Sequence, residues 1–302
     1  MRVFLTGGRG FVGSNVAAVF EAECEELLAP DREQLDVTDA AAVAASVAAF
    51  RPDAIVHCAI LNDFGALYTR RRDAWEVYVG STRALADAAN HNGAQLVLVS
   101  TDWVFDGTQG GADEATPPNP INAYGFLKAA SELVLAERAT LGAVARLSGV
   151  NGIHRAHPDA PRRQDAGFGY FVASLVDALS EGRRFTVWES RAINMVASPV
   201  LASTAARLIL GIVERRLEGV FHCCGSEAID RRALALRTTD AFELDRELLD
   251  FGPPPAEALP PGPVPYDTSL SGEATERALD TRLPDVDALL TGLRAEREGS
   301  LA

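Results

Sequence analysis

Three glycines spaced three residues apart, directly after a short apolar segment, constrain the fold of this chain most. Arg2–Leu5 has the composition of a buried strand, and Gly7, Gly10 and Gly13 follow it. Such a loop turns tightly, lets backbone N–H groups approach a pyrophosphate, and starts a helix whose positive end faces the phosphates. The pattern predicts a dinucleotide-binding loop whose cofactor contacts are Gly7, Arg9, Gly10, Phe11, Val12 and Gly13.

Apolar segments and helical stretches continue to alternate after this loop. Ala54–Ala59 and Gln95–Val99 are apolar runs typical of parallel strands that are buried on both faces. An alanine-rich helix with an N-cap within Asp36–Asp39 precedes the first run, and an amphipathic helix over 73–90 separates the two. The alternation predicts an α/β fold with a right-handed, doubly wound parallel sheet, the Rossmann architecture. Within it, His57 is interpreted as a core histidine.

The second half of the chain is expected to form a smaller lobe. We assign 1–150 to a dinucleotide-binding Rossmann domain and 151–302 to a C-terminal substrate-binding lobe, with about 190–222 returning to the first domain. Phe168–Leu179 has the apolar spacing of a helix. Gly219–Cys223 is predicted to be a strand that rejoins the sheet.

The end of the second strand bears on the choice of cofactor. An acid there binds the adenosine ribose and favours NAD(H), whereas an arginine favours the 2′-phosphate of NADP(H). Asp31 and Arg32 are both present, and Arg9 is a second candidate for the phosphate. The alternative is that both arginines are only solvent-exposed. The pattern favours NADP(H) and leaves NAD(H) open. The cofactor contacts predicted beyond the glycine loop are Asp31, Arg32, Asp36, Val37 and Ala59.

A threonine and a tyrosine–lysine pair are the candidate catalytic groups. Thr101 follows the apolar run that ends at Val99, and open α/β sheets bind ligands at the carboxyl ends of their strands. Tyr124 and Lys128 lie four residues apart, so they share one face of a helix over 124–137. A nearby cation favours a phenolate, so Lys128 is expected to lower the pKa of Tyr124. A solvated helix face is the ordinary interpretation of this pair alone.

Composition excludes several other classes. The chain has 302 residues and a net charge of −14, which argues against nucleic acid and anionic membranes as partners. Its four cysteines form neither a C-x-x-C motif nor a disulfide framework. We find no signal-peptide pattern and no run of 18 apolar residues. A cytoplasmic protein that acts on a small molecule is expected.

The segment S-T-D-W-V-F-D-G at 100–107, together with the glycine loop, Tyr124 and Lys128, resembles an extended short-chain dehydrogenase/reductase. The similarity is greatest to the dTDP-4-dehydrorhamnose reductase family and covers nearly the whole chain. It implies that Thr101, Tyr124 and Lys128 are catalytic. Tyr124 would donate a proton to a carbonyl oxygen while hydride leaves the nicotinamide, and Lys128 would bind the nicotinamide ribose. It also implies that Asp102 and Trp103 lie near the sugar.

Comparison with neighbouring families refines this resemblance. The glycine loop and Arg32 also look like GDP-fucose synthase, which uses NADP. Nucleotide-sugar 4,6-dehydratases carry T-D-E where this chain has Trp103, which disfavours a dehydratase. Related enzymes tend to have an asparagine, structural or proton-relaying, where this chain has Tyr78. Glu189–Pro199 keeps little of the family's D-Q-x-G-x-P-T segment, so the sugar specificity does not transfer.

A polar loop over 153–169 is rich in arginine and histidine. Guanidinium groups bind phosphate in a bidentate manner, so Arg155, Arg162 and Arg163 are candidate substrate ligands. The alternative is a surface loop with incidental arginines. No metal site is expected from His154 and His157, because no carboxylate or cysteine partner has ligand spacing.

The leading hypothesis is therefore an NAD(P)-dependent oxidoreductase that reduces the keto group of a nucleotide-activated sugar. One alternative is a nucleotide-sugar epimerase, which uses the same residues but keeps its nicotinamide bound. Another is a non-catalytic regulatory subunit, since the β subunit of methionine adenosyltransferase resembles the same reductases. By family analogy, a homodimer could form through the helices at 73–90 and 124–140.

Overall fold

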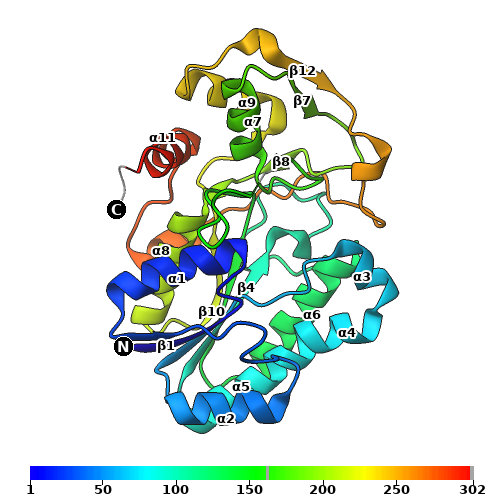
Figure 1. Cartoon of the computed structure of the whole chain (residues 1–302). Helices are drawn as coiled ribbons and strands as arrows, with labels where there is room; N and C mark the ends of the chain where they lie inside the picture. Colours follow the sequence, from blue (N-terminus) through cyan, green and yellow to red (C-terminus); the bar gives the residue numbers. More distant parts are fainter. Residues whose placement is uncertain (161–162, 300–302) are drawn as a thin grey trace.

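The computed structural model describes residues 1–160 and 163–299, and its largest element is a six-stranded parallel sheet (Figure 1). The strand order is β10-β5-β4-β3-β1-β2, so the chain builds outward from β1 in both directions. The predicted α/β, doubly wound Rossmann fold is confirmed. The strands are β1 (Arg2–Thr6), β2 (Glu26–Leu28), β3 (Ala54–His57), β4 (Gln95–Thr101), β5 (Gly142–Leu147) and β10 (Gly219–Cys223).

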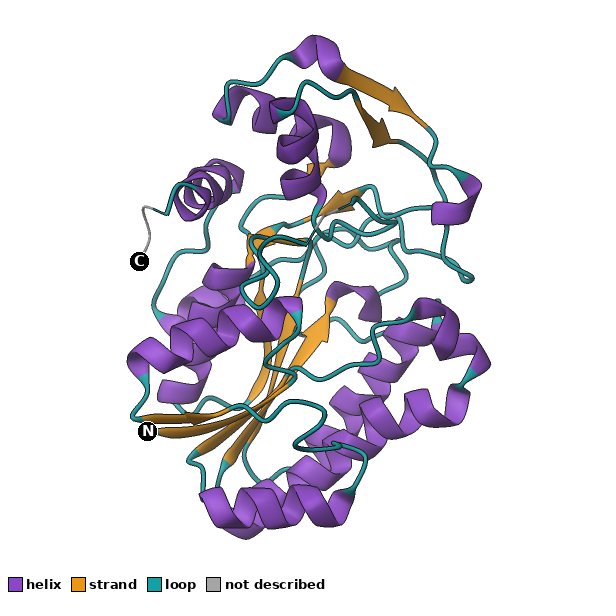
Figure 2. Cartoon of the chain, in the orientation of Figure 1, coloured by secondary structure: helices purple, strands orange, loops and turns teal. Residues whose placement is uncertain are grey.

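Helices cover both faces of this sheet (Figure 2). One face shares an apolar core with the first helix and a helix from the second half of the chain, and three helices cover the other face. Because β3 and β4 are buried along their whole length, their apolar runs have no polar alternation. The covering helices are α1 (Phe11–Glu23) and α8 (Ala202–Glu214), then α2 (Ala40–Phe50), α5 (Ser81–Asn92) and α6 (Ala123–Arg138), with α10 (Glu273–Leu279) beside β10.

The single helix predicted over 73–90 is interrupted. The chain forms α3 (Phe64–Thr69) and α4 (Arg71–Trp75), passes through the π-helical segment η1 (Glu76–Gly80), and continues as α5. The hydroxyls of Ser81 and Thr82 donate hydrogen bonds to the carbonyls of Val77 and Tyr78. Side chains thus compete for carbonyls that would otherwise serve the regular helix, which accounts for the wider turn.

A second group of elements, here called the small lobe, packs over the carboxyl edge of the sheet around its own apolar core. Its helix α7 begins at Phe171, three residues later than predicted, because Tyr170 adopts a left-handed φ of 57°. The small lobe contains α7 (Phe171–Ser180), α9 (Arg231–Ala241) and α11 (Val286–Arg297), and the strand pairs β6 (Val150–Asn151) with β9 (Val200–Leu201), β7 (Phe185–Trp188) with β12 (Leu249–Gly252), and β8 (Val196–Ala197) with β11 (Ile229–Asp230).

The glycine loop has the close packing that its sequence predicts. Gly7 has a φ of 73°, and a Cβ there would lie 2.5 Å from the backbone nitrogen of Ala59. A Cβ on Gly13 would lie 2.0 Å from the carbonyl oxygen of Gly7. The amide of Gly10 donates to that same carbonyl over 3.0 Å. Glycine is therefore required at two points where the strand turns into α1.

Polar residues of the sheet region have mainly structural partners. His57 is buried between the hydroxyls of Thr6 (2.7 Å) and Ser81 (3.0 Å), which confirms its interpretation as a core histidine. Asp39 caps α2 by accepting hydrogen bonds from the amides of Ala41 and Ala42.

Within 1–160 and 163–299, no group of three or more His, Cys, Asp or Glu side chains could hold a metal ion. In the same ranges, no helix combines the length and apolar character that a membrane crossing needs.

Candidate active site

A cavity with a volume of about 1290 Å³ lies at the carboxyl edge of the parallel sheet, between the glycine loop and the small lobe. This is the edge at which open α/β sheets bind their ligands. Nearly all of the predicted site residues line it, although they come from distant parts of the chain. They are Gly7, Arg9, Gly10, Phe11, Val12, Gly13, Asp31, Arg32, Asp36, Val37, Ala59, Thr101, Asp102, Trp103, Tyr124 and Lys128.

One end of the cavity is the start of α1. This helix has no side-chain cap at Gly10 and no acidic residue in its first turn. Its first N–H groups have no intrahelical partners and the residues that carry them line the cavity, so the helix dipole favours an anion there. A dinucleotide pyrophosphate fits this position, because its charge matches the helix end and glycine leaves room for close approach.

The end of the cavity beyond β2 carries both acidic and basic groups. Asp31 accepts hydrogen bonds from the amides of Gln34 and Glu33 and from the guanidinium of Arg9, at 3.1 Å for the last. These bonds lower the pKa of Asp31. Arg9 and Arg32 are both exposed and line the cavity. An adenosine ribose at this end would therefore meet one carboxylate that is already occupied and two guanidinium groups.

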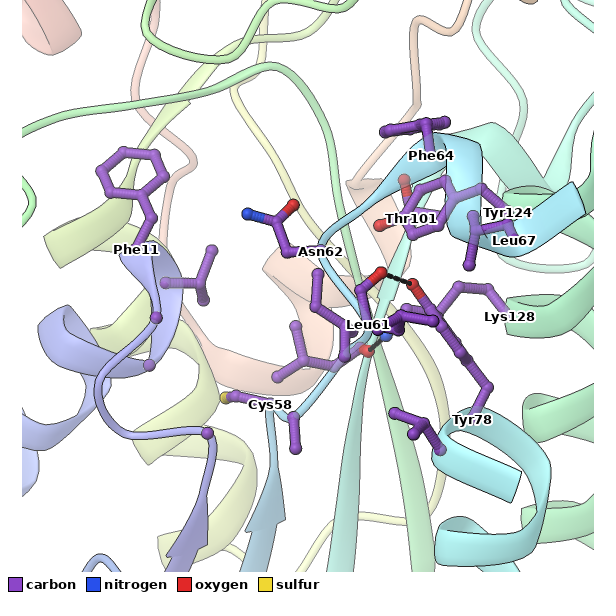
Figure 3. Close-up of a pocket in the computed structure, with 18 of the residues that line it drawn as sticks. Phe11, Cys58, Leu61, Asn62, Phe64, Leu67, Tyr78, Thr101, Tyr124 and Lys128 are labelled. Atoms are coloured by element: carbon purple, nitrogen blue, oxygen red, sulfur yellow. Dashed lines mark hydrogen bonds between the residues drawn. The ribbon is translucent and has the colours of Figure 1, made fainter. Parts of the chain in front are cut away.

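Thr101 and Tyr124 meet because α6 approaches the end of β4 closely. Asn122 caps α6 by accepting from the amide of Gly125 at 2.8 Å, which places Tyr124 in the first helical turn. A Cβ on Gly125 would lie 2.0 Å from the carbonyl oxygen of Trp103, so only glycine permits this approach. Lys128 follows one turn later on the same face. Figure 3 shows the three predicted catalytic side chains around one part of the cavity.

Aromatic rings enclose the phenol of Tyr124. Its ring centroid lies 5.5 Å from Phe64, 6.0 Å from Trp103 and 6.2 Å from Tyr78. Burial among these groups raises the pKa of Tyr124 to about 12, a hydrogen bond with Thr101 works against this rise, and the charge of Asp102 adds to it. The lowered pKa predicted for Tyr124 is therefore wrong for the protein itself, because desolvation outweighs the hydrogen bond with Thr101.

Lys128 is almost completely withdrawn from solvent, with 4% of its surface exposed. Its ammonium donates to the carbonyl oxygen of Val99 at 2.7 Å (Figure 3). Burial lowers the pKa of Lys128 to about 8, while the charges of Cys58 and Glu132 raise it. The lysine is thus anchored to the backbone of β4, one turn of helix away from the phenol.

A feature of the composition marks the same residue. Lys128 is the only lysine in a chain whose lysines and arginines together number 28. Arginine serves everywhere else as the cation, including the buried pair of Arg146 with Glu132. Arginine is larger and always charged, whereas lysine is a compact cation whose pKa responds to burial. The count alone could have distinguished Lys128 from the solvated face of a helix.

Asp102 joins three separate parts of the chain. Its carboxylate accepts hydrogen bonds from the hydroxyls of Thr101 (3.0 Å), Ser148 (2.9 Å) and Thr268 (2.6 Å). Burial raises the pKa of Asp102 to about 6, and these hydroxyls partly offset the rise. Although Asp102 lines the cavity, both of its oxygens are engaged within the protein. Its main visible role is to hold Thr101 in place.

The predicted phosphate clamp is not formed by the described residues. Arg155 does not line the cavity, because its guanidinium bonds Asn15 of α1 at 3.1 Å and lies 3.9 Å from Glu296 of α11. Arg163 is exposed and is also absent from the cavity wall. Arg162 lies outside the described residues. The structure contradicts the prediction for Arg155 and Arg163, because neither side chain reaches the cavity, although the end of the same loop, 165–169, lines it.

Several lining residues gave no signal in the sequence. Phe64 and Leu67 of α3 face the cavity, as does the short segment 257–260, which follows a proline-rich stretch. Arg70 and Arg72, which directly precede the helix predicted over 73–90, also line the cavity. These residues reach the site only through long-range packing, so local patterns could not identify them.

Comparisons with known proteins agree with this geometry. The family model described as the RmlD substrate binding domain matches residues 1–295. The chain belongs to the RmlD substrate-binding-domain family. The resemblance to dTDP-4-dehydrorhamnose reductases is thereby confirmed.

Three known proteins illustrate what this chain is similar to. The chain is 28% identical to methionine adenosyltransferase 2 subunit beta of Xenopus tropicalis over 258 residues, covering 80% of this chain and 72% of that protein. It is 35% identical to a dTDP-4-keto-6-deoxy-D-glucose reductase of Streptomyces niveus over 158 residues, covering 51% and 55%. Its fold matches dTDP-4-dehydrorhamnose reductase of Bacillus anthracis in complex with NADP, with a TM-score of 0.82, 23% identity and coverage of 98% and 99%.

The buried carboxyl of Asp102 predicts a pH-dependent stability. Its folded pKa of about 6 lies above the ordinary value near 3.9, so the neutral form stabilises the fold at low pH. This contribution is lost as pH rises through about 6, because the charged form must stay buried. Relative to Asp102→Asn, the wild type should lose on the order of 2 kcal/mol between pH 4 and 7. Urea unfolding of both proteins across this range measures the difference, and parallel pH profiles would contradict it.

Proposed function

We propose that this protein is a reductase that transfers hydride from a nicotinamide dinucleotide to the keto group of a nucleotide-activated sugar. The observation that carries the proposal is the meeting of Thr101, Tyr124 and Lys128 in a cavity that begins at the glycine loop. A phenol, a fixed hydroxyl and an ammonium at the far end of a dinucleotide-sized cavity suit carbonyl reduction. Related proteins of the family are reductases of this kind by name.

The protonation state of Tyr124 suits the direction of reduction. With its pKa raised to about 12, the phenol is protonated at neutral pH and can act as a general acid. Its proton goes to the carbonyl oxygen of the substrate as the carbonyl carbon gains hydride, so a ketone becomes a secondary alcohol. The hydride is what bound NADPH would supply. The ammonium of Lys128 and the hydroxyl of Thr101 then stabilise the phenolate that remains.

Other residues hold the reactants and exclude water. Gly10, Phe11 and Val12 present the start of α1 to the pyrophosphate. The rings of Trp103 and Phe64 pack against that of Tyr124 and shield the phenol from solvent. This shielding keeps Tyr124 from exchanging its proton with bulk water during hydride transfer.

NADP(H) is the favoured cofactor, with NAD(H) as the alternative. Asp31 would bind ribose hydroxyls, but its carboxylate is already bonded to Arg9 and to two backbone amides. Arg9 and Arg32 offer guanidinium groups to a 2′-phosphate at the same place. The Bacillus anthracis structure named above contains NADP, which supports this choice.

Replacing Tyr124 with phenylalanine tests the proposed acid. The ring and its packing remain, so cofactor affinity should stay within about twofold of wild type, while kcat for ketone reduction falls by at least about 100-fold. NADPH oxidation followed at 340 nm with a panel of keto-sugar nucleotides gives the rate, and fluorescence titration gives the affinity. Turnover retained in this variant would refute the role of Tyr124.

The pair Arg9→Ala and Arg32→Ala tests the cofactor choice. Removing charge-assisted contacts to a 2′-phosphate should weaken NADPH binding by roughly 10- to 100-fold and leave NADH binding within about twofold. Isothermal titration with both nucleotides measures this. Arg83→Ala, on an exposed part of α5 outside the cavity wall, is the matched control. An equal loss of affinity for NADPH and NADH would mean that these arginines do not bind the 2′-phosphate.

One observation favours a second candidate, a cofactor-binding regulatory subunit. Among the described residues of the small lobe that line the cavity, none is a lysine or arginine, whereas Asp165 and Glu257 are acidic. A sugar diphosphate would receive no cation from that wall. The similarity of this chain to methionine adenosyltransferase 2 subunit beta supports this alternative. Absence of turnover with the keto-sugar panel, together with a stable partner enzyme in pull-downs, would favour the regulatory subunit over the reductase.

An epimerase, the other alternative, would retain tightly bound NAD(H) without net consumption of the cofactor.

A homodimer through α6 is also proposed. Phe126 and Leu133 project from α6 with 55% and 63% of their surfaces exposed, and Trp75 of the neighbouring α4 is 44% exposed. Exposed apolar groups on adjacent helices are typical of an oligomer interface. Leu133→Glu should convert a dimer to a monomer in light scattering, and an unchanged mass would exclude this interface.

The free state of all four cysteines supports a reducing compartment such as the cytoplasm.

A further inference from the structure

Tyr78, which stands where related enzymes tend to have asparagine, lies directly beside the catalytic lysine. It belongs to the π-helical segment η1 and is 2% exposed. The ammonium of Lys128 lies 5.5 Å from the centroid of its ring, within the range of a cation–π contact. The same ring meets that of Tyr124 edge-on, at 6.2 Å and 80°. One side chain therefore contacts both members of the proton-donating pair.

Hydrogen bonds at both ends of the residue fix this ring. Its hydroxyl donates to the carbonyl oxygen of Leu61 at 3.3 Å (Figure 3). Its own carbonyl oxygen accepts from the hydroxyls of Ser131 (3.0 Å) and Thr82 (2.7 Å). A carbonyl held in this way is already satisfied by the protein and has less need of a water molecule. Tyr78 thus fills the space beside Lys128 with an anchored aromatic surface.

The surroundings of Lys128 leave the ring an electrostatic role. The carboxylate on the same helix, Glu132, is paired with Arg146 at 2.7 Å and accepts from Ser100. Besides the phenols of Tyr78 and Tyr124, the thiol of Cys58 and the imidazole of His57 lie near the ammonium on the β3 side. The carbonyl of Val99 takes one of the three N–H groups. A buried ammonium needs further compensation, and the negative face of a ring provides it.

We propose that Tyr78 is a positioning residue for catalysis, whose ring face holds the Lys128 ammonium in place beneath Tyr124 and keeps water away from it. The proposal rests on the reductase function for its catalytic meaning. This role explains why tyrosine stands in place of asparagine, because an aromatic ring replaces a small polar side chain beside the lysine. Lys128 is then stabilised by contacts within the protein and not by a chain of solvent molecules.

The single lysine makes a direct test practical. Protein grown with 13C-labelled lysine should give one side-chain signal in heteronuclear NMR, and its shift against pH reports the pKa of Lys128 without substrate or turnover. Tyr78→Phe keeps the ring and should leave this pKa within about 0.3 units of wild type. Tyr78→Leu keeps an apolar group but removes the ring face, so the pKa should fall by about 0.5 to 1.5 units. Tyr78→Met serves if the leucine variant does not fold.

Further readouts separate this proposal from the reductase proposal. Lys128→Arg must remove the NMR signal, and thermal melting checks that each variant is folded. In kcat/KM against pH, the alkaline midpoint should move down with Tyr78→Leu and return with Tyr78→Phe. An unchanged or higher pKa in Tyr78→Leu, or equal shifts in the leucine and phenylalanine variants, would overturn the role of the ring. Because the NMR titration needs no substrate, a failed reductase assay leaves its result intact.

Discussion

The arrangement of this site depends on keeping one ammonium charged inside a protein. A buried cation costs several kcal/mol unless polar or aromatic groups compensate for its lost hydration. Here β4 supplies the carbonyl of Val99, η1 supplies the ring of Tyr78, and α6 carries the lysine itself. Three elements must therefore stay in register for Lys128 to remain where it is. The π-helical turn of η1 is the local distortion that accompanies this packing.

Asp102 extends the same constraint to the rest of the molecule. Its carboxylate accepts hydrogen bonds from hydroxyls on β4, at the end of β5 and on the C-terminal segment that carries Thr268. Asn194 in turn binds the carbonyls of Val196 and Tyr266, so this junction also reaches the small lobe. The position of Thr101 is thus coupled to the joint between the sheet and the small lobe. Chemistry and lobe packing share one network.

Local sequence patterns predicted most of the fold and of the cofactor side of the site. The glycine loop, the apolar strands and the tyrosine–lysine spacing depend on residues close in sequence, so the structure agrees with them. The errors arose where distant contacts decide. Arg155 donates a hydrogen bond to Asn15, which lies 140 positions away in the sequence. The pKa of Tyr124 is raised because Phe64 and Trp103 help to bury its ring. The segment 257–260 reaches the cavity only because the small lobe folds over it.

The presence of one lysine in the whole chain has a practical consequence for anyone handling this protein. Reagents that acylate primary amines have two targets, the α-amino group and Lys128, and the second is shielded inside the cavity. Labelling beyond one equivalent therefore reports opening of the cavity or loss of the fold. The same reaction, followed by mass, counts intact active sites in a preparation without any knowledge of the substrate.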